Sequence, residues 1–227
     1  MTIFDDVPSG HLRLCSLLRV RVSTTIVLAV TLMLILFAGC AERVTLVDKF
    51  DGNSTLNWVL ESDELGQTVI DSGQLKFTIP AAGVARYSTA EGVIGGNFVA
   101  EVETIQLAGS TNAGYGMLFR MNGSDQFYRF NITGNGYYMV EKRVAGGEWV
   151  RLTNDWQETT LLLTGLNNRN FIAVEARGSN LGFSINGFEV FSTTDSDFSS
   201  GGIALNAGTF DQGGLVVAFD NFSLETR

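Results

Sequence analysis

The feature that most constrains this chain is a series of short segments after Cys40 in which apolar and polar residues alternate. Successive side chains of a β-strand point to opposite faces, so this alternation predicts half-buried strands, and no helical periodicity of useful length competes with it. Turn sequences separate the segments, among them Asn186-Gly187, which is typical of a two-residue hairpin. The predicted strands are residues 44–50, 68–71, 74–79, 85–88, 98–107, 115–121, 126–132, 137–144, 149–152, 171–177, 181–185, 188–192, 203–207 and 215–224.

The composition agrees with short strands joined by tight turns. The 227 residues include 26 Gly, 16 Phe, 5 Tyr and 3 Trp, but only 2 Pro. Hydrophobic residues make up 45% of the chain and charged residues 17%, which supplies enough apolar material for a core. No Pro-rich or Ser-rich linker divides the region after Cys40. The strand number and spacing therefore predict one domain that is a two-sheet antiparallel sandwich or a barrel.

Six short motifs, taken in their order along the chain, resemble one fold family. They are residues 127–130 (FYRF), 136–138 (GYY), 147–149 (GEW), 184–187 (SING), 197–205 (DFSSGGIAL) and 217–222 (VAFDNF). Together they resemble the concanavalin A-like (laminin G-like) jelly-roll superfamily, and in particular bacterial domains akin to the 3-keto-disaccharide hydrolase family, over residues 50–224. The resemblance implies an all-β, two-sheet antiparallel jelly-roll sandwich. It leaves the activity open, because this fold carries lectins, glycanases and adhesion modules.

The first 40 residues resemble the export signal of a bacterial lipoprotein. Three arginines in residues 13–21 precede the apolar run of residues 26–37, which is short for a membrane-spanning helix. Residues 37–40 (FAGC) then resemble the lipobox, in which the cysteine, here Cys40, receives the lipid. Phe37 departs from the pattern, which prefers Leu at that position.

Two topologies stay open for this leader. In the first, residues 1–39 are a lipoprotein signal peptide, residues 40–46 are the lipidated N-terminus with a short tether, and residues 47–227 are the jelly-roll domain. In the second, the uncharged residues 22–41 are retained as a membrane-spanning anchor. Both predict a signal or anchor helix before the sandwich and an exported domain attached to a membrane, at an outer membrane or the cell surface. The oligomeric state stays unknown.

The residues after Cys40 restrict the chemistry of the exported part. Three of the 15 basic and two of the 24 acidic residues precede Cys40, which leaves 12 basic and 22 acidic residues and a net charge of −10. This charge disfavours nucleic acid as a partner. The only histidine is His11 and the only cysteines are Cys15 and Cys40. A Ser-His-Asp or Cys-His mechanism, a His or Cys zinc site and an internal disulfide are therefore excluded after Cys40.

The predicted strands within residues 115–143 form a meander that carries long polar side chains at same-face positions. Planar side chains stack on sugar rings and forked donors bridge neighbouring hydroxyls, so such a strip suits a carbohydrate ligand. An ordinary solvated face is the equal alternative. Tryptophans such as Trp149 and Trp156 can add stacking platforms, although in a sandwich a Trp is more often part of the core. The predicted ligand-binding residues are Arg120, Arg129, Asn131, Tyr137, Glu141 and Trp156.

Glu101 and Glu103 are the candidates for catalysis. Residues i and i+2 share one face of a strand, so the two carboxylates are expected side by side. Jelly-roll glucanases of the laminarinase type carry three acids at alternate positions, and the outer two serve a retaining mechanism. Here the flanking same-face positions are Val99 and Ile105, so the match is partial. Two solvated glutamates on an exposed strand are the favoured alternative.

A structural calcium ion is the only cofactor that the sequence suggests. Jelly-roll domains of the resembled type often bind Ca²⁺ where the first and last strands meet, which implies Asp220 together with Asp51 or Asp48 as ligands. The alternative is that Asp220 caps a turn or forms a hydrogen bond with the backbone.

These observations favour a surface-tethered lipoprotein whose domain binds carbohydrate or another envelope component without catalysis. A glycoside-cleaving enzyme that uses Glu101 and Glu103 is the first alternative. A purely structural or adhesion module is the second.

Overall fold

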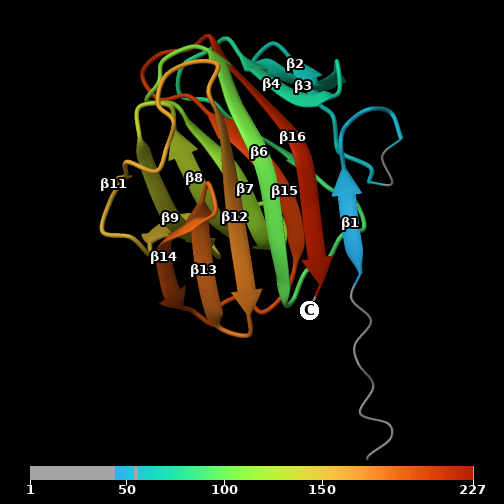
Figure 1. Ribbon diagram of the computed structural model, residues 1–227, viewed down its shortest axis with the longest axis vertical. Coiled ribbons are helices and arrows are strands. Elements are labelled where there is room, and N and C mark those ends of the chain that lie inside the picture. The colour runs from blue at the N-terminus through green and yellow to red at the C-terminus, as the bar shows by residue number, and fades with distance from the viewer. Residues whose placement is uncertain (1–43, 54–55, 227) are drawn as a thin grey trace, which may run out of the picture. The chain divides into compact units, whose positions relative to one another are not determined.

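Sixteen strands form two antiparallel sheets in the part of the chain that the computed structural model describes, residues 44–53 and 56–226 (Figure 1). All these residues belong to one compact unit. Cys40 and the predicted signal or anchor helix lie outside the described residues. The described part holds no helix that is long and apolar enough to cross a membrane.

The nine-stranded sheet contains both the first and the last strand of the described chain, and β1 (Thr45–Asp48) pairs with β16 (Leu215–Thr226) at its side. The other strands, in their spatial order with β16 between β6 and β4, are β14 (Phe188–Thr194), β13 (Asn180–Ile185), β12 (Arg169–Arg177), β6 (Phe98–Ala108), β4 (Gln74–Ile79), β3 (Gly66–Asp71) and β2 (Ser62–Asp63).

The seven-stranded sheet is built around the predicted meander of three consecutive strands. Six of its strands lie side by side in this order: β10 (Glu148–Arg151), β9 (Tyr137–Val144), β8 (Phe127–Thr133), β7 (Gly114–Met121), β15 (Gly202–Gly208) and β5 (Ala85–Thr89). The seventh, the short strand β11 (Gln157–Glu158), also pairs with β9.

The core lies between the two sheets and is rich in aromatic rings. Phe119 on β7 stacks on Tyr128 of β8 with ring centroids 5.1 Å apart. Phe183 on β13 of the other sheet contacts Phe119 and Phe130, at 6.0 and 5.2 Å. Each fully buried ring of this kind stabilises the fold by about 1.5–3 kcal/mol. The alternation in the sequence directs these rings inward from both layers.

The two-sheet antiparallel sandwich that the sequence predicts is confirmed. Every predicted strand is present, and the two-residue strands β2 and β11 were not predicted because they are too short to show alternation. Asn186 and Gly187 have φ angles of 51° and 83°, as the predicted two-residue hairpin requires.

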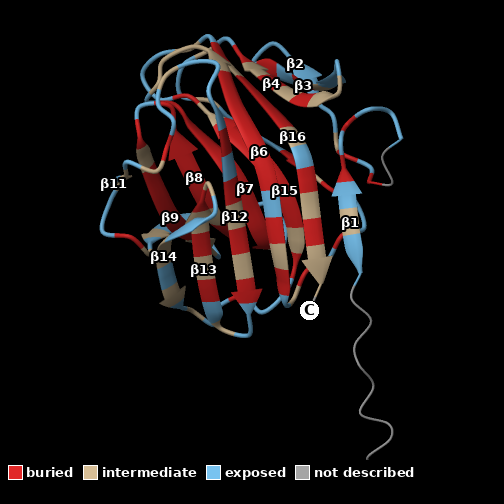
Figure 2. Ribbon diagram, in the orientation of Figure 1, coloured by how far each residue is buried: buried red, intermediate tan, exposed pale blue. Residues whose placement is uncertain are grey.

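The two layers differ in how their outer faces are exposed (Figure 2). On β12 and β13 of the nine-stranded sheet, buried and more exposed residues alternate, as in a sheet with one solvated face. On β7, β8 and β9, almost every residue is buried, including those that point away from the core. The outer face of the seven-stranded sheet, meaning the face turned away from the core, is therefore recessed at its centre.

Candidate ligand-binding face

Glycines form the floor of the outer face of the seven-stranded sheet. Gly116 on β7 lies opposite Asn131 of β8 and Asn206 of β15, and Gly114 lies opposite Gly208. Residues opposite each other in adjacent strands share a face. A Cβ atom on Gly116 would lie 2.1 Å from the carbonyl oxygen of Phe130, so the backbone there leaves no space for a side chain. Glycine inside a strand lets a ligand or another chain segment approach the backbone closely.

The first hollow on this face, the Trp156 hollow, has a volume of about 290 Å³ and combines aromatic rings with short polar side chains. The Trp156 ring packs over the floor, because a Cβ on Gly114 would lie 3.3 Å from its Cη2 atom. Phe210 meets Trp156 edge to face, with ring centroids 6.2 Å apart. The lining residues are Asn112, Thr133, Asn135, Tyr137, Trp156 and Phe210.

Hydrogen bonds fix the polar wall of the Trp156 hollow. The Thr133 hydroxyl donates to Oδ1 of Asn135 at 2.6 Å and accepts the backbone N–H of Tyr137 at 3.1 Å. These contacts leave the carboxamide nitrogen of Asn135 free for a ligand, since no hydrogen bond of that atom occurs among the described residues. A ligand in this hollow would meet an aromatic surface and amide groups at once.

The second hollow, the arginine hollow, has a volume of about 120 Å³ and contains Arg129, Arg143 and Trp149 in its wall. Nε and Nη2 of Arg129 both donate to Oε1 of Glu141, with Nε 2.9 Å from that oxygen. The Arg129 guanidinium also lies over the Trp149 ring, 3.9 Å from the ring centroid. Phe127 supports the same ring edge to face at 5.6 Å. The ion pair and the cation–π contact hold this wall in a fixed arrangement.

Two carboxamides flank Gly116 on this face. Asn131 and Asn206 are 5% and 4% exposed, and the Oδ1 atom of each is buried without a hydrogen-bond partner among the described residues. Buried polar atoms in native proteins are nearly always hydrogen-bonded, so these two oxygens are acceptors for a donor such as water or a ligand hydroxyl.

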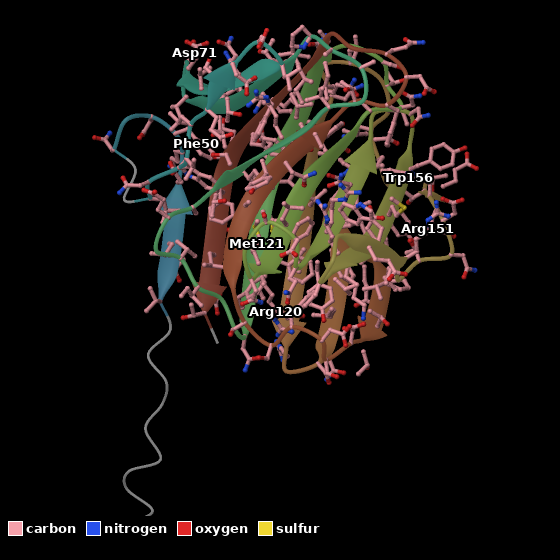
Figure 3. The ribbon with its side chains drawn as sticks, turned by 180° about the vertical axis from the view of Figure 1, so that it is seen from behind. Phe50, Asp71, Arg120, Met121, Arg151 and Trp156 are labelled. Atoms are coloured by element: carbon pink, nitrogen blue, oxygen red, sulfur yellow. The ribbon has the colours of Figure 1, made fainter. Side chains whose placement is uncertain are left out.

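Four of the predicted ligand-binding residues share this face and a fifth borders it. Arg129 lies opposite Glu141, and Asn131 lies opposite Met139. Tyr137 is two residues before Met139 on β9 and therefore shares its face. Trp156 and Tyr137 line the same hollow. The structure thus brings Arg129, Asn131, Tyr137, Glu141 and Trp156 to one side of the sandwich, the side from which Figure 3 is viewed.

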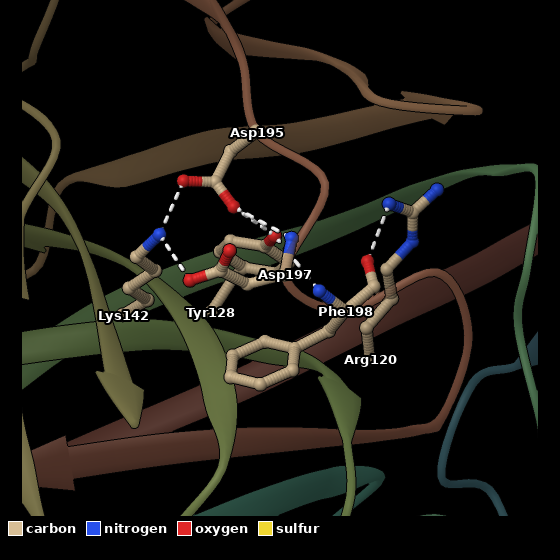
Figure 4. A network of polar contacts seen from close by, with 6 residues as sticks. All are labelled: Arg120, Tyr128, Lys142, Asp195, Asp197 and Phe198. Carbon is tan, nitrogen blue, oxygen red and sulfur yellow. Dashed lines mark hydrogen bonds and ion pairs between the residues drawn. The ribbon is translucent and has the colours of Figure 1, made fainter. Parts of the chain in front are cut away.

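Arg120 was predicted on the same face and does not lie there. The register of β7 against β15 shifts between Gly202 and Ile203, and Arg120 at this bulge has a φ of 50°. A bulge turns a side chain out of the alternating pattern, and here the guanidinium points inward and is fully buried. It donates to the carbonyl oxygen of Phe198 at 2.9 Å (Figure 4). It also donates to the carbonyl oxygens of Gly96 and Gly178, both at 2.8 Å. Its role is to close one end of the sandwich.

Glu101 and Glu103 lie on the outer face of the nine-stranded sheet, in the other layer. Glu103 is buried in an ion pair with Arg169 and accepts a hydrogen bond from Nδ2 of Asn221 at 3.3 Å. Glu101 is exposed. Neither residue lines the Trp156 hollow or the arginine hollow. The two glutamates are therefore not brought to the candidate ligand-binding face.

The residues suggested for calcium are engaged locally. Asp220 accepts the backbone N–H of Asn221 at 2.7 Å, and Asp51 accepts that of Asn53 at 3.0 Å. Asp48 accepts the N–H of Phe50 and the indole N–H of Trp58, both at 2.7 Å. Within the described ranges no group of three or more His, Cys, Asp or Glu side chains is placed to hold a metal ion. The calcium site stays a prediction.

Sequence reasoning missed several residues of the face. Asn206 lies within β15, Arg143 lies near the end of β9, and Phe210 lies in the connection from β15 to β16. The signal that was available is Gly116 inside the predicted strand of residues 115–121, with Gly114 close before it, because strand glycines often mark a close approach to the backbone.

No protein-family model matches this chain, and none of the curated proteins matches it in sequence. Among solved structures, it is similar to a carbohydrate binding module, CBM66, from Bacillus subtilis, with a TM-score of 0.55 and 17% identity over 76% of this chain and 94% of that one. It is also similar to a Bacillus licheniformis beta-glucanase, with a TM-score of 0.58 and 11% identity over 81% and 98% of the two chains. A Bacillus subtilis protein with a galectin-like fold gives a TM-score of 0.56 and 10% identity over 75% and 90%. At these identities the likeness concerns the fold, and the described residues have the concanavalin A-like jelly-roll fold.

Proposed function

We propose that the outer face of the seven-stranded sheet binds carbohydrate and that the domain acts as a binding module without a catalytic step. The observation that carries this proposal is the pairing of the Trp156 ring with amide side chains above a glycine floor. Sugar rings present an apolar face that packs on aromatic rings and hydroxyls that pair with amides. The Trp156 hollow supplies both kinds of contact within about 290 Å³, the lower end of the usual size for ligand pockets.

The unpaired oxygens of Asn131 and Asn206 support the same ligand class. A carboxamide oxygen accepts a hydrogen bond, and a polyhydroxyl ligand is rich in donors. The solved structures of similar fold include a carbohydrate binding module and a beta-glucanase, which fits a carbohydrate ligand at the level of the fold alone.

Binding is favoured over glycoside cleavage because Glu101 and Glu103 lie in the layer opposite to the two hollows. A retaining glycosidase needs two carboxyl groups that flank the scissile bond. Glu103 is instead neutralised by Arg169. Glu141 lies on the candidate face, but it is held by Arg129. The polar hollows also favour a binding module over a purely structural one, which would need none.

The proposal includes the localisation that the leader implies. The protein would be an exported lipoprotein, held at an outer membrane or cell surface through Cys40. Cells that express the full chain and are grown with labelled palmitate are expected to incorporate the label into it. The Cys40→Ser variant is expected to lose the label. Equal labelling of the two forms would contradict the anchor and leave the ligand-binding proposal untouched.

The binding proposal is tested with the full chain, purified in detergent, on a glycan array and then by calorimetry with the glycans that bind. Trp156→Ala is expected to weaken that binding by about tenfold, because it removes an aromatic platform. Phe188→Ala is the matched control, since Phe188 is an exposed aromatic residue on β14 of the other sheet. An array without any bound glycan, or equal effects of the two variants, would overturn the proposal.

A further inference from the structure

The arginine hollow points to the chemical class of the ligand, and we propose that it receives the carboxylate of an acidic sugar, such as a uronic acid. This inference rests on the proposed carbohydrate-binding function and makes it more specific. It concerns a second place on the same face, distinct from the Trp156 hollow.

Arg143 is the residue that carries this inference. It lies on β9 opposite Phe127, and its guanidinium is 5.6 Å from the centroid of the Trp149 ring. Its Nε is buried and has no hydrogen-bond partner among the described residues. The arginines around it are paired, Arg129 with Glu141 and Arg151 with Asp155, whereas no ion pair of Arg143 occurs in the described part of the chain. A partly buried cation without a counter-charge is costly unless an anion comes to it.

The charge around the hollow is opposite to that of the whole protein. The chain has a net charge of −9, yet none of the described residues that line the arginine hollow is Asp or Glu. Arg86 belongs to its wall, but the guanidinium of Arg86 is paired with Asp63. Since Glu141 neutralises Arg129, the surplus positive charge of the hollow is that of Arg143. A small basic hollow in an acidic protein selects for a local anion.

The other lining groups favour a sugar as the carrier of that anion. Asn206 contributes a carboxamide oxygen that has no hydrogen-bond partner among the described residues and can accept a hydrogen bond from a hydroxyl. Tyr87 and Trp149, each 39% exposed, line the same hollow. A guanidinium binds a carboxylate through two parallel hydrogen bonds. The volume of about 120 Å³ is well below the roughly 300 Å³ of the smaller whole-ligand pockets, so the hollow holds one substituent of a larger ligand.

The experiment compares acidic oligosaccharides with forms of the same sugars that lack the charge. The full chain in detergent is titrated with tetrasaccharides of galacturonate, mannuronate and hyaluronan, and with the methyl ester of each. At least one acid is expected to bind about tenfold more tightly than its ester, because the ester loses the charge-assisted pair. Raising the salt concentration is expected to weaken binding of the acid and to leave the ester unchanged.

Arg143→Gln is expected to weaken binding of that acid to the level of its ester, with the ester affinity and the unfolding midpoint unchanged. Arg151→Gln is the matched control, because Arg151 is exposed on β10 and lies outside both hollows. Equal affinities for acid and ester, or equal effects of the two variants, would overturn this inference. If neutral glycans still bind in that case, the proposed carbohydrate-binding function stands. Binding of no glycan, acidic or neutral, would overturn the proposed function itself.

Discussion

Lys142 on β9 and Asp195, in the connection from β14 to β15, form an ion pair with Nζ 2.5 Å from Oδ2 (Figure 4). The same ammonium group lies 2.6 Å from Oδ2 of Asp197, and the Tyr128 hydroxyl donates to the other oxygen of Asp195 at 2.5 Å. The connection passes from the nine-stranded to the seven-stranded sheet, so this network fastens the crossing between the two layers.

We predict that Asp195→Asn lowers the free energy of unfolding by about 2–3 kcal/mol at neutral pH, because it leaves the largely buried Lys142 with one exposed partner. Urea denaturation followed by fluorescence measures the change. Asp197→Asn is the matched control, and its cost is expected to stay below about 1 kcal/mol because the Asp197 side chain is 51% exposed. A larger loss of stability from Asp197→Asn than from Asp195→Asn would show that Asp197, not Asp195, is the main partner of Lys142.

The same pair predicts how stability depends on pH. Burial raises the pKa of Asp195, but the hydrogen bonds from Lys142 and Tyr128 outweigh it and bring the pKa below its ordinary value of 3.8. The contribution of Asp195 is thus complete above about pH 4 and is lost as the pH falls through the lowered pKa. The stability difference between the wild type and Asp195→Asn is expected to shrink below about pH 4. A constant difference down to pH 2 would contradict this account.

At high pH the network of Lys142, Asp195 and Tyr128 loses stability because its proton donors lose their protons. Burial lowers the pKa of Lys142, but the hydrogen bonds to Asp195 and Asp197 outweigh this effect and raise the pKa above its ordinary value of 10.5. Burial also raises the pKa of the Tyr128 hydroxyl. The contributions of Lys142 and Tyr128 to the stability of the fold are complete below their ordinary pKa values and decline as the pH rises above about 10. Denaturation at pH 9 and at pH 11 measures this decline. The loss is expected to be smaller in Lys142→Met.

Arg120→Met is expected to destabilise the fold by about 3–5 kcal/mol, because the carbonyl oxygens of Gly96, Gly178 and Phe198 lose a buried charged donor. Chemical denaturation measures the loss. Arg177→Met is the control, because Arg177 is exposed and its loss is expected to change stability by less than about 0.5 kcal/mol. Under conditions where Arg120→Met is folded, its glycan affinity is expected to equal that of the wild type. A loss of glycan affinity in folded Arg120→Met would contradict this account and indicate that Arg120 takes part in ligand binding.

Gly114→Val is expected to lift the Trp156 ring from the floor and weaken glycan binding. Even a Cβ at Gly114 would lie 3.3 Å from both Trp156 and the Asn131 side chain, and the two methyl groups of Val come closer still. Tryptophan fluorescence and calorimetry measure the two effects. Gly96→Ala is the control, since its Cβ would make only ordinary contacts of 3.8 Å or more. Unchanged fluorescence and affinity in Gly114→Val would show that the ring does not depend on the floor.

The strands of the sandwich could be predicted from the sequence, because the alternation on segments such as β8 and β9 reports directly which side chains face the core. Arg129, Asn131 and Glu141 were placed correctly by the same rule. Arg120 was not, because a bulge with a positive φ interrupts the alternation without a sequence signature of its own. The contact of Trp156 with Gly114 joins a loop to a strand about forty residues earlier, which no local pattern encodes.

The pairing of β1 with β16 has a mechanical consequence for the anchored protein that we propose. β1 lies beside the end of the last strand, with Thr45 opposite Glu225 and Asp48 opposite Phe222 (Figure 1). A pull on the chain before β1, directed along the strand, stretches all its inter-strand hydrogen bonds together instead of opening them one after another. The force then reaches Asp48, whose carboxylate is bonded to the indole of Trp58. A membrane attachment that pulls along β1 would load this strand pair in shear, the direction in which a short strand resists force best.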